Sequence, residues 1–173
     1  MALTSIGIED LGMLIKKALL KDNVEPKEAD QITQCLLYAE TRGNNQGVIK
    51  LASGALKQHP DALQYPITVE HETPVSAKLH GHQHIGMAVL AKMTTMAKTK
   101  ASVSGIACIA ASGYSSATGA LGHWARTLAE AGLVGIVMSQ CPEMVYIIPL
   151  TLTLTLTLTL TLTLTLTLNL NLT

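Results

Sequence analysis

The sequence predicts an α/β fold in which a helical N-terminal lobe passes into a mixed or parallel sheet covered by helices. Apolar residues recur at helical spacing over residues 8–20 and 26–42. Two short apolar runs of strand length follow at residues 106–111 and 133–138. Between these runs, residues 118–131 have the pattern of a helix. Such a strand–helix–strand unit predicts two parallel strands.

Three helices are expected to form the N-terminal lobe. The first covers residues 8–20. The second begins at Pro26, whose fixed φ suits a first helical turn, and ends at Gly43, a common C-terminal stop. A third and shorter helix is expected from about residue 46 to residue 58. Residues 1–58 should therefore be almost wholly helical.

Two strand-like runs and one helix connect this lobe to the predicted parallel strands. Residues 67–72 and 75–80 are separated by Thr73 and Pro74, which predicts a bent hairpin or an edge pair. Residues 85–97 have a helical pattern, although they include a glycine.

The end of the chain is a simple repeat. Strict Thr-Leu alternation runs from Thr151 to Leu168 of the 173 residues. We therefore divide the chain into residues 1–150, which can carry a function, and a low-complexity tail at residues 151–173. The tail has the period of an amphipathic strand. A translated ACCCTA-type nucleotide repeat is the better interpretation, and it implies a gene truncated after about Pro149.

The tail also bears on membranes and on self-association. Half of its residues are threonine, and no aromatic or basic anchors flank its end, so we expect no membrane span. An uncharged and β-prone repeat is instead an aggregation hazard. We therefore expect self-association or a homodimer.

Composition excludes several classes of protein. The net charge is zero, with 12 basic and 12 acidic residues, and phenylalanine is absent, so we expect no nucleic-acid partner. Cys35, Cys108 and Cys141 lie far apart in apolar runs, which predicts buried thiols in a reducing compartment. The N-terminus lacks a basic segment followed by an apolar run, so a cytoplasmic location is expected.

Three polar segments could carry chemistry, and the first is the turn after the second helix. A polar turn bounded by Gly43 and Gly47 presents backbone N–H groups and the cation of Lys50, which suits recognition of a carboxylate. The alternative is an ordinary helix–helix connection with asparagine caps, and the residue types alone favour it.

The second segment contains three alternating histidines. On an extended segment, His80, His82 and His84 would project to one side and offer a metal face. The alternative is a polar loop before a helix. No carboxylate or cysteine accompanies the cluster, so the loop is favoured and no metal is assigned.

The third segment, residues 112–122, is a small and hydroxyl-rich turn that joins a strand to a helix. Such a turn suits phosphate or ribose contacts. It lacks the Gly-x-Gly-x-x-Gly order, which excludes an ordinary Rossmann motif. Close packing at Gly119 and Gly122 is the simpler explanation of these residues.

These segments together resemble the malate/L-lactate dehydrogenase family of NAD(P)-dependent oxidoreductases over nearly all of residues 5–145, about the first half of a family member. The family motif Arg-Gly-x-x-Ser-His-Gly-Val-x-Arg supplies an acid/base histidine and an arginine for the substrate carboxylate. With one residue fewer, Asn45 falls on the serine, Gln46 on the histidine and Lys50 on the arginine. The resemblance thus implies a catalytic position at Gln46 and substrate binding by Asn45 and Lys50.

The third segment is similar to the family's Asn-Ser-x-His-Phe-Gly-x-x-Gly motif, which contacts cofactor and substrate. Ser115, Gly119 and Gly122 match it, whereas Ala117 replaces the histidine. The resemblance implies cofactor contacts at the three matching residues, with NAD or NADP as the cofactor. It also implies an incomplete, non-Rossmann malate/L-lactate dehydrogenase-like fold.

The activity implied by the resemblance is hydride transfer on a small 2-hydroxy or 2-oxo acid. Glutamine cannot deliver a proton at neutral pH, and lysine lacks the bidentate fork of arginine. We therefore expect a truncated member that is weak or inactive. The alternative is a catalytically dead relic, or a partner-binding fragment that does not bind a dinucleotide.

Overall fold

The computed structural model describes residues 5–139, so the predicted boundary at residue 150, the repeat tail and Cys141 lie outside the described residues. The chain divides into two compact units, Met1–Val137 and Met138–Thr173. The helices and strands described below all belong to the first unit. Within the described residues, no helix combines the length and the apolar character needed to span a membrane.

Two helices form the predicted N-terminal lobe. α1 (Ile8–Lys21) has acidic residues in its first turn and a lysine in its last, and these charges interact favourably with the helix dipole. α2 (Pro26–Glu40) begins at the predicted proline. Ile15 and Leu19 of α1 pack with Ile32 and Leu36 of α2 in the main core.

The third predicted helix is wrong for most of its length. Only α3 (Ile49–Ala52) forms there, and a short α4 (Pro60–Gln64) follows it. Before α3, side chains cap the backbone: Asn44 Oδ1 accepts the Gln46 N–H at 2.9 Å, and Glu40 accepts the Val48 N–H at 2.9 Å. Gly54, with a left-handed φ of +73°, lies just after α3, so the helix ends after about one turn.

The sheet has three strands in the order β1-β2-β3. β1 (Thr68–Glu72) and β2 (Ser76–His80) pair antiparallel, which confirms the predicted hairpin. β3 (Cys108–Ser112) pairs parallel with β2, with Ser76 opposite Cys108 and His80 opposite Ser112. The predicted α/β class with a mixed sheet is therefore confirmed.

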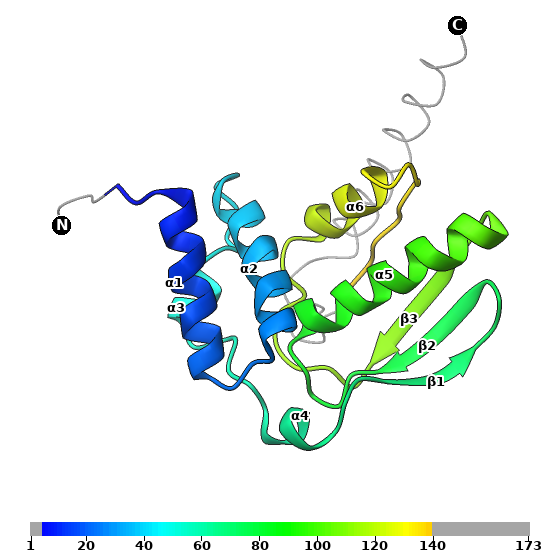
Figure 1. Cartoon of the computed structure of the whole chain (residues 1–173), viewed down its shortest axis with the longest axis horizontal. Helices are drawn as coiled ribbons and strands as arrows, with labels where there is room; N and C mark the ends of the chain where they lie inside the picture. Colours follow the sequence, from blue (N-terminus) through cyan, green and yellow to red (C-terminus); the bar gives the residue numbers. More distant parts are fainter. Residues whose placement is uncertain (1–4, 140–173) are drawn as a thin grey trace, which may run out of the picture. The chain divides into compact units, whose positions relative to one another are not determined.

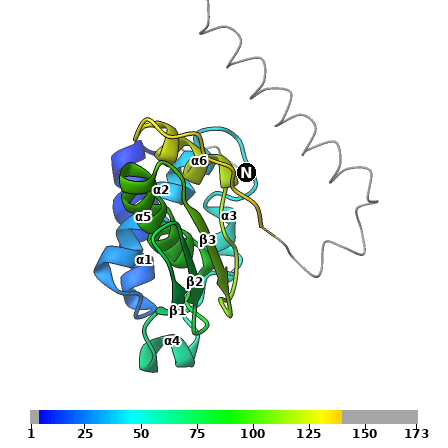
Figure 2. The same cartoon turned by 90° about the vertical axis from the view of Figure 1, so that its right-hand side faces the viewer.

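The long helix α5 (Gly86–Ser104) crosses from β2 to β3 and lies along one face of the sheet (Figure 1, Figure 2). It extends past the predicted end at residue 97 and stops at Gly105, which has a left-handed φ of +76°. Val89 of α5 packs with Ala77 and Leu79 of β2 in a second, smaller core.

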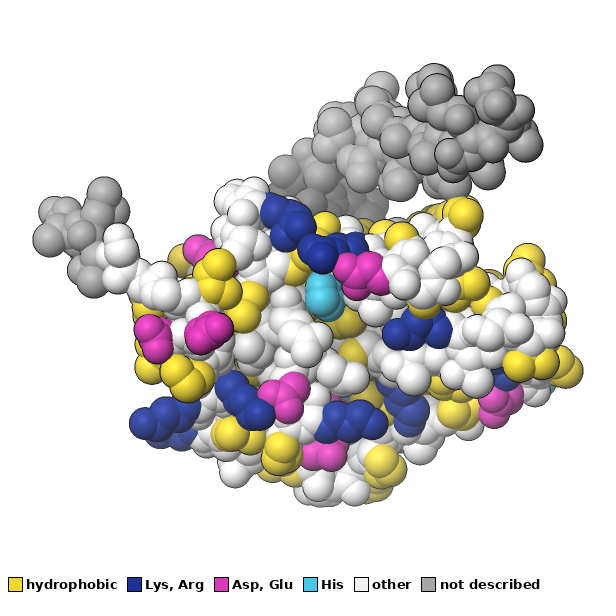
Figure 3. Space-filling model, turned by 45° about the horizontal axis from the view of Figure 1, so that its top comes forward, with side chains coloured by type: hydrophobic (Ala, Val, Ile, Leu, Met, Phe, Trp, Pro, Cys, Tyr) yellow, Lys and Arg dark blue, Asp and Glu magenta, His cyan; other side chains and the backbone are white. Residues whose placement is uncertain are grey.

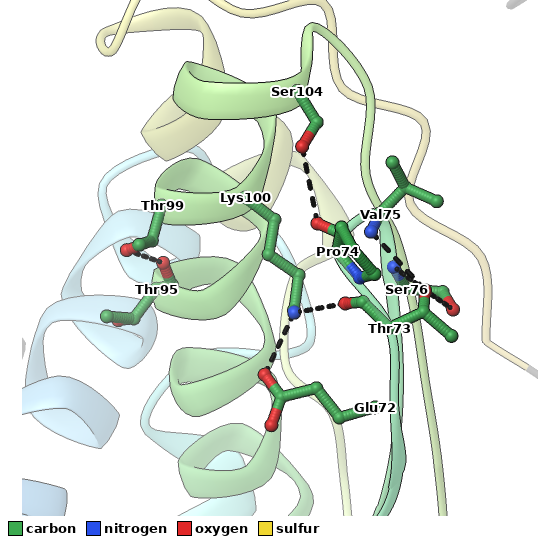
Figure 4. Close-up of polar contacts among 9 residues, drawn as sticks. All are labelled: Glu72, Thr73, Pro74, Val75, Ser76, Thr95, Thr99, Lys100 and Ser104. Atoms are coloured by element: carbon green, nitrogen blue, oxygen red, sulfur yellow. Dashed lines mark hydrogen bonds and ion pairs between the residues drawn. The ribbon is translucent and has the colours of Figure 1, made fainter.

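The last turns of α5 also hold the hairpin (Figure 4). Lys100 Nζ donates to the Thr73 carbonyl at 2.6 Å and forms an ion pair with Glu72 at 2.8 Å. Thr73 Oγ1 accepts the backbone N–H of Ser76 at 3.0 Å, which closes the turn between the two strands. The hairpin is therefore tied to the helix that covers the sheet.

The predicted second parallel strand at residues 133–138 is wrong. α6 (Leu121–Ala129) forms near its predicted place, but the residues after it pair with no strand in the described part of the chain. They fold back on α6 instead: Gly132 has φ of +75°, and the Leu133 N–H donates to the Leu128 carbonyl at 3.1 Å. Alternate residues remain half-buried, which explains why the sequence has a strand pattern.

Candidate functional site

The α2–α3 connection and α3 hold the residues predicted to bind and convert the substrate, with Asn45 and Gln46 in the connection and Lys50 in α3. Gly47 is buried there, and a Cβ at this position would overlap the Glu40 carboxylate, so only glycine fits. Asn45 is exposed, and its Oδ1 accepts a hydrogen bond from Gln46 Nε2 at 3.3 Å. The Lys50 side chain is half-buried, and no residue between 5 and 139 forms an ion pair with its ammonium group.

The turn after β3 carries the residues predicted to contact the cofactor. Ser115 is fixed to the segment before α5 by three hydrogen bonds. Its Oγ donates to the Gln83 carbonyl at 2.8 Å, its N–H donates to the His84 carbonyl at 3.0 Å, and its own carbonyl accepts the Gly86 N–H at 2.8 Å. The turn is therefore held rigidly at the N-terminus of α5.

The two predicted cofactor glycines lie against other helices. Gly119 is buried with φ of +72°, and a Cβ there would overlap Cys35 Sγ and come within 3.1 Å of Met87 Cγ. A Cβ at Gly122 would lie 2.9 Å from the Tyr38 hydroxyl. Both positions require glycine because the turn and α6 approach α2 and α5 closely.

The structure links the turn after β3 to the α2–α3 connection. The Ser116 hydroxyl donates to the Ala55 carbonyl, and the Ala55 N–H donates to the Lys50 carbonyl at 3.1 Å. The Lys50 N–H in turn donates to the Gly47 carbonyl at 3.0 Å. This hydrogen-bonded path, named here the Ser116–Gly47 path, joins the two segments of the candidate site. Among the described residues, the Gln46 side-chain amide donates to Asn45 Oδ1 and does not take part in this path.

The three histidines do not form the extended row that the sequence suggested. His82 and Gln83 have positive φ values of 43° and 62°, so the segment turns and the alternation is lost. His82 Nε2 lies 2.9 Å from Thr68 Oγ1, and His80 Nδ1 accepts the His82 N–H at 3.1 Å. No set of three metal-ligating side chains gathers anywhere in residues 5–139.

His84 forms a buried pair that the sequence reasoning missed. Its Nε2 donates to the Tyr65 carbonyl at 2.9 Å, and its Nδ1 lies 3.0 Å from Glu28 Oε1. Burial raises the pKa of Glu28, and the nearby His84 opposes this shift in part. A signal was available, because Glu28 falls on the buried stripe of α2 with Ile32, Cys35 and Ala39.

The cysteines agree with the prediction only in part. Cys35 and Cys108 are free thiols, but Cys35 alone is buried, and Cys108 is exposed on β3. Burial raises the pKa of the Cys35 thiol to about 11, so it is a packing residue and not a nucleophile at neutral pH.

Comparison with known proteins identifies the scaffold. The profile of the malate/L-lactate dehydrogenase family matches residues 6–149. The ureidoglycolate dehydrogenase (NAD(+)) of Escherichia coli O157:H7 is 30% identical over 151 residues, which are 81% of this chain and 41% of that protein. The same enzyme from Escherichia coli strain K12 is 29% identical. The chain thus spans about two fifths of the length of these curated relatives.

Solved structures show the same arrangement of helices and strands. The malate dehydrogenase of Pyrococcus horikoshii OT3 superposes with a TM-score of 0.65 at 27% identity, over 75% of this chain and 38% of that one. The sulfolactate dehydrogenase of Methanocaldococcus jannaschii, at 22% identity and a TM-score of 0.60, shares the fold over 70% of this chain and 36% of that one. The resemblance to the front half of the family is therefore confirmed, and the chain belongs to the malate/L-lactate dehydrogenase family.

Proposed function

We propose that residues 1–150 carry the substrate-binding part of a NAD(P)-dependent dehydrogenase of small 2-hydroxy or 2-oxo acids, in a truncated form whose hydride transfer is weak or absent. The observation that carries this proposal is the Ser116–Gly47 path. It holds the turn after β3 against the connection that contains Gln46 and Lys50. Both segments match parts of a dehydrogenase motif, and the fold keeps them together.

Lys50 is the residue proposed to hold the carboxylate of the acid. Its half-buried ammonium group has no acidic partner among the described residues, so its charge is available to a substrate. An ammonium group binds a carboxylate as a point charge, without the paired hydrogen bonds of a guanidinium. Asn45, exposed on the same connection, is proposed to assist by hydrogen bonding.

Gln46 is proposed to polarise the reacting oxygen. Its amide can donate a hydrogen bond to a carbonyl, but it cannot exchange a proton at neutral pH. General acid–base catalysis typically contributes on the order of 10²–10⁴ to a rate. We therefore expect any turnover by this chain to be lower by about that factor than with a histidine in the same position.

NAD or NADP is proposed as the cofactor, and its nicotinamide ring would accept or supply the hydride when bound. The Cβ directions of Gly119 and Gly122 are filled by protein atoms, so these two residues would meet a dinucleotide through their backbone. Ser115 is proposed to contact the cofactor from the same turn. Positive φ at Ser116 and Gly119 supports this role, because such turns bring N–H groups together around an anion.

A second candidate function rests on the exposed apolar side chains. Ile106, Val134 and Ile136 are each at least two-thirds exposed. Such side chains favour contact with a partner or with a second copy of the chain. In this alternative, the chain is a catalytically dead or partner-binding member that binds no dinucleotide. For either function we propose a cytoplasmic location, which the free thiols of Cys35 and Cys108 support.

Titration of the 173-residue protein with NADH and NADPH, followed by nucleotide fluorescence, tests the proposal. We expect saturable binding, and then slow or no oxidation of NADH with oxaloacetate or pyruvate. Lys50→Met should weaken any effect of the oxo acid on NADH oxidation, whereas Lys57→Met, which changes an exposed lysine between α3 and α4, should not. A folded protein that leaves the fluorescence of both nucleotides unchanged would favour the partner-binding alternative.

A further inference from the structure

A pocket of about 410 Å³ lies between α2 and α6. The predicted cofactor residue Gly122 packs against Tyr38, which lines it. Leu37, Tyr38 and Arg42 line it from the side of α2, and His123, Arg126 and Glu130 line it from α6. Figure 3 shows a face of the molecule on which basic, acidic and histidine side chains gather. Asn45, Gln46, Lys50 and Ser115 are not among the lining residues.

The pocket has two guanidinium groups that are already restrained. The Arg42 guanidinium lies 3.8 Å from the centre of the Tyr38 ring, and its Nη1 donates to the Tyr38 carbonyl at 3.1 Å. Arg126 Nε donates to Glu130 Oε1 at 2.6 Å. These bonds use few of the five N–H donors of each arginine. Within residues 5–139, no carboxylate pairs with Arg42.

His123 is a half-buried residue that lines the same pocket. Its ring makes edge contacts with Tyr38, at 5.4 Å between ring centres, and with Trp124, at 4.7 Å. Burial lowers the pKa of His123, and the positive charges of Arg126 and Arg42 lower it further, whereas Glu130 acts in the opposite direction. Glu130 offsets one of the two arginine charges, so the lining of the pocket carries a net positive charge.

We propose that this pocket binds a small oxyanion, either a phosphate or a carboxylate group, between Arg42 and Arg126. The planar guanidinium groups supply charge-assisted hydrogen bonds, and His123 adds a further donor when it takes up a proton. Leu37 and the ring of Tyr38 provide an apolar wall for a carbon skeleton attached to the anion. The pocket borders the proposed cofactor residue Gly122 through Tyr38, but binding of an oxyanion there needs neither a dinucleotide nor turnover.

Histidine NMR of the full chain tests this proposal directly. The His123 resonance, identified by its loss in His123→Gln, is followed against pH at constant ionic strength in chloride. The titration is then repeated with sulfate, which imitates phosphate without titrating itself, and with acetate and malate. We expect at least one oxyanion to raise the pKa of His123 with a saturable concentration dependence. Sulfate acting alone would identify a phosphate site, and the carboxylates acting alone would identify an organic acid site.

Charge variants show whether the response comes from the pocket. Arg42→Gln and Arg126→Gln should each lower the affinity for the oxyanion about 10-fold, because each removes a charge-assisted contact. Glu130→Gln should strengthen it several-fold, because it frees Arg126 from its carboxylate partner. Lys27→Gln removes a charge from the far end of α2 and should change nothing.

Two results would overturn the proposal. The first is an equal response of His123 to chloride and to every oxyanion at matched ionic strength, which would be general screening. The second is unchanged or weaker oxyanion affinity in Glu130→Gln. Glu130 is exposed, so this variant keeps the test decisive even if an arginine variant fails to fold.

Discussion

Replacing Gly119 by alanine tests whether close packing explains the glycine at this predicted cofactor position. Its φ of +72° lies in the left-handed region, where a Cβ costs about 1–2 kcal/mol. The new Cβ would also overlap Cys35 Sγ and lie 3.1 Å from Met87 Cγ and Sδ. Overpacking of this kind typically costs about 1–3 kcal/mol. We therefore expect Gly119→Ala to lower the free energy of unfolding by about 2–5 kcal/mol.

Two companion variants separate these contributions. Gly105→Ala has a similar φ of +76°, but its Cβ would meet no atom within 4 Å, so it should cost only the conformational part. Cys35→Ala removes the overlapping sulfur. The double variant Cys35→Ala/Gly119→Ala should therefore be more stable than the sum of the two single changes, by about 0.5–3 kcal/mol.

Urea unfolding of the full chain, followed by circular dichroism, gives these free energies. An additive double variant would show that Gly119 does not press against Cys35. A cost of Gly119→Ala no larger than that of Gly105→Ala would show the same. Either result would refute the packing explanation and leave the glycine to be explained by backbone contact with a ligand.

Three further predictions use the same unfolding measurement. The raised pKa of Glu28, which faces His84, means that the folded state binds its proton more tightly than the unfolded state. Stability contributed by this carboxyl is therefore full below about pH 4.5 and is lost as the pH rises through the folded pKa, and Glu28→Gln should remove that slope. The lowered pKa of His123 has the opposite effect. The stability that it contributes is full above pH 6.5, the ordinary pKa of histidine, and is lost as the pH falls through the folded pKa. His123→Gln should therefore reduce the loss of stability on acidification. Lys100→Met should cost about 1 kcal/mol and speed amide exchange at Ser76, whereas Lys98→Met should do neither.

Local signals predicted the parts of the fold whose boundaries depend on single residues. Pro26 marks the start of α2, because its ring fixes φ and its missing N–H is not needed there. The pair Thr73-Pro74 breaks the hairpin into β1 and β2. In both places the chain neighbours alone decide the structure, so the sequence is sufficient.

The errors arose where partners distant along the chain, or side chains, decide the structure. Residues 133–138 have a strand's composition, but the chain turns at Gly132, and the segment packs on Leu128 of α6 instead of pairing with β3. The predicted third helix stops early because Gly54 has a left-handed φ of +73°, and the N–H groups of Gly54 and Ala55 close the helix end on the Leu51 and Lys50 carbonyls. A periodic pattern records which residues are half-buried and not which strand they will pair with.

The candidate site could be predicted as segments but not as geometry. The resemblance points to the turn after β3 and to the α2–α3 connection, and the site residues in both stay a prediction. The bond from Ser116 to Ala55 joins this turn to the segment just after α3. His123 had no signal in the sequence, because its neighbours Tyr38 and Arg42 come from α2 and the turn after it. Side chains that gather from distant helices leave no local pattern to read.

The pattern of retained and altered family residues has a physical explanation. Gly119 and Gly122 match the family because any larger side chain would strike Cys35 or Tyr38. Gln46 and Lys50, which depart from it, are half-buried on a connection, where a change of side chain costs little stability. Such a chain can lose its proton donor and keep its fold. Family membership therefore does not decide between a weak dehydrogenase and an inactive relic, whereas the dinucleotide titration does, because it measures binding without requiring Gln46 to transfer a proton.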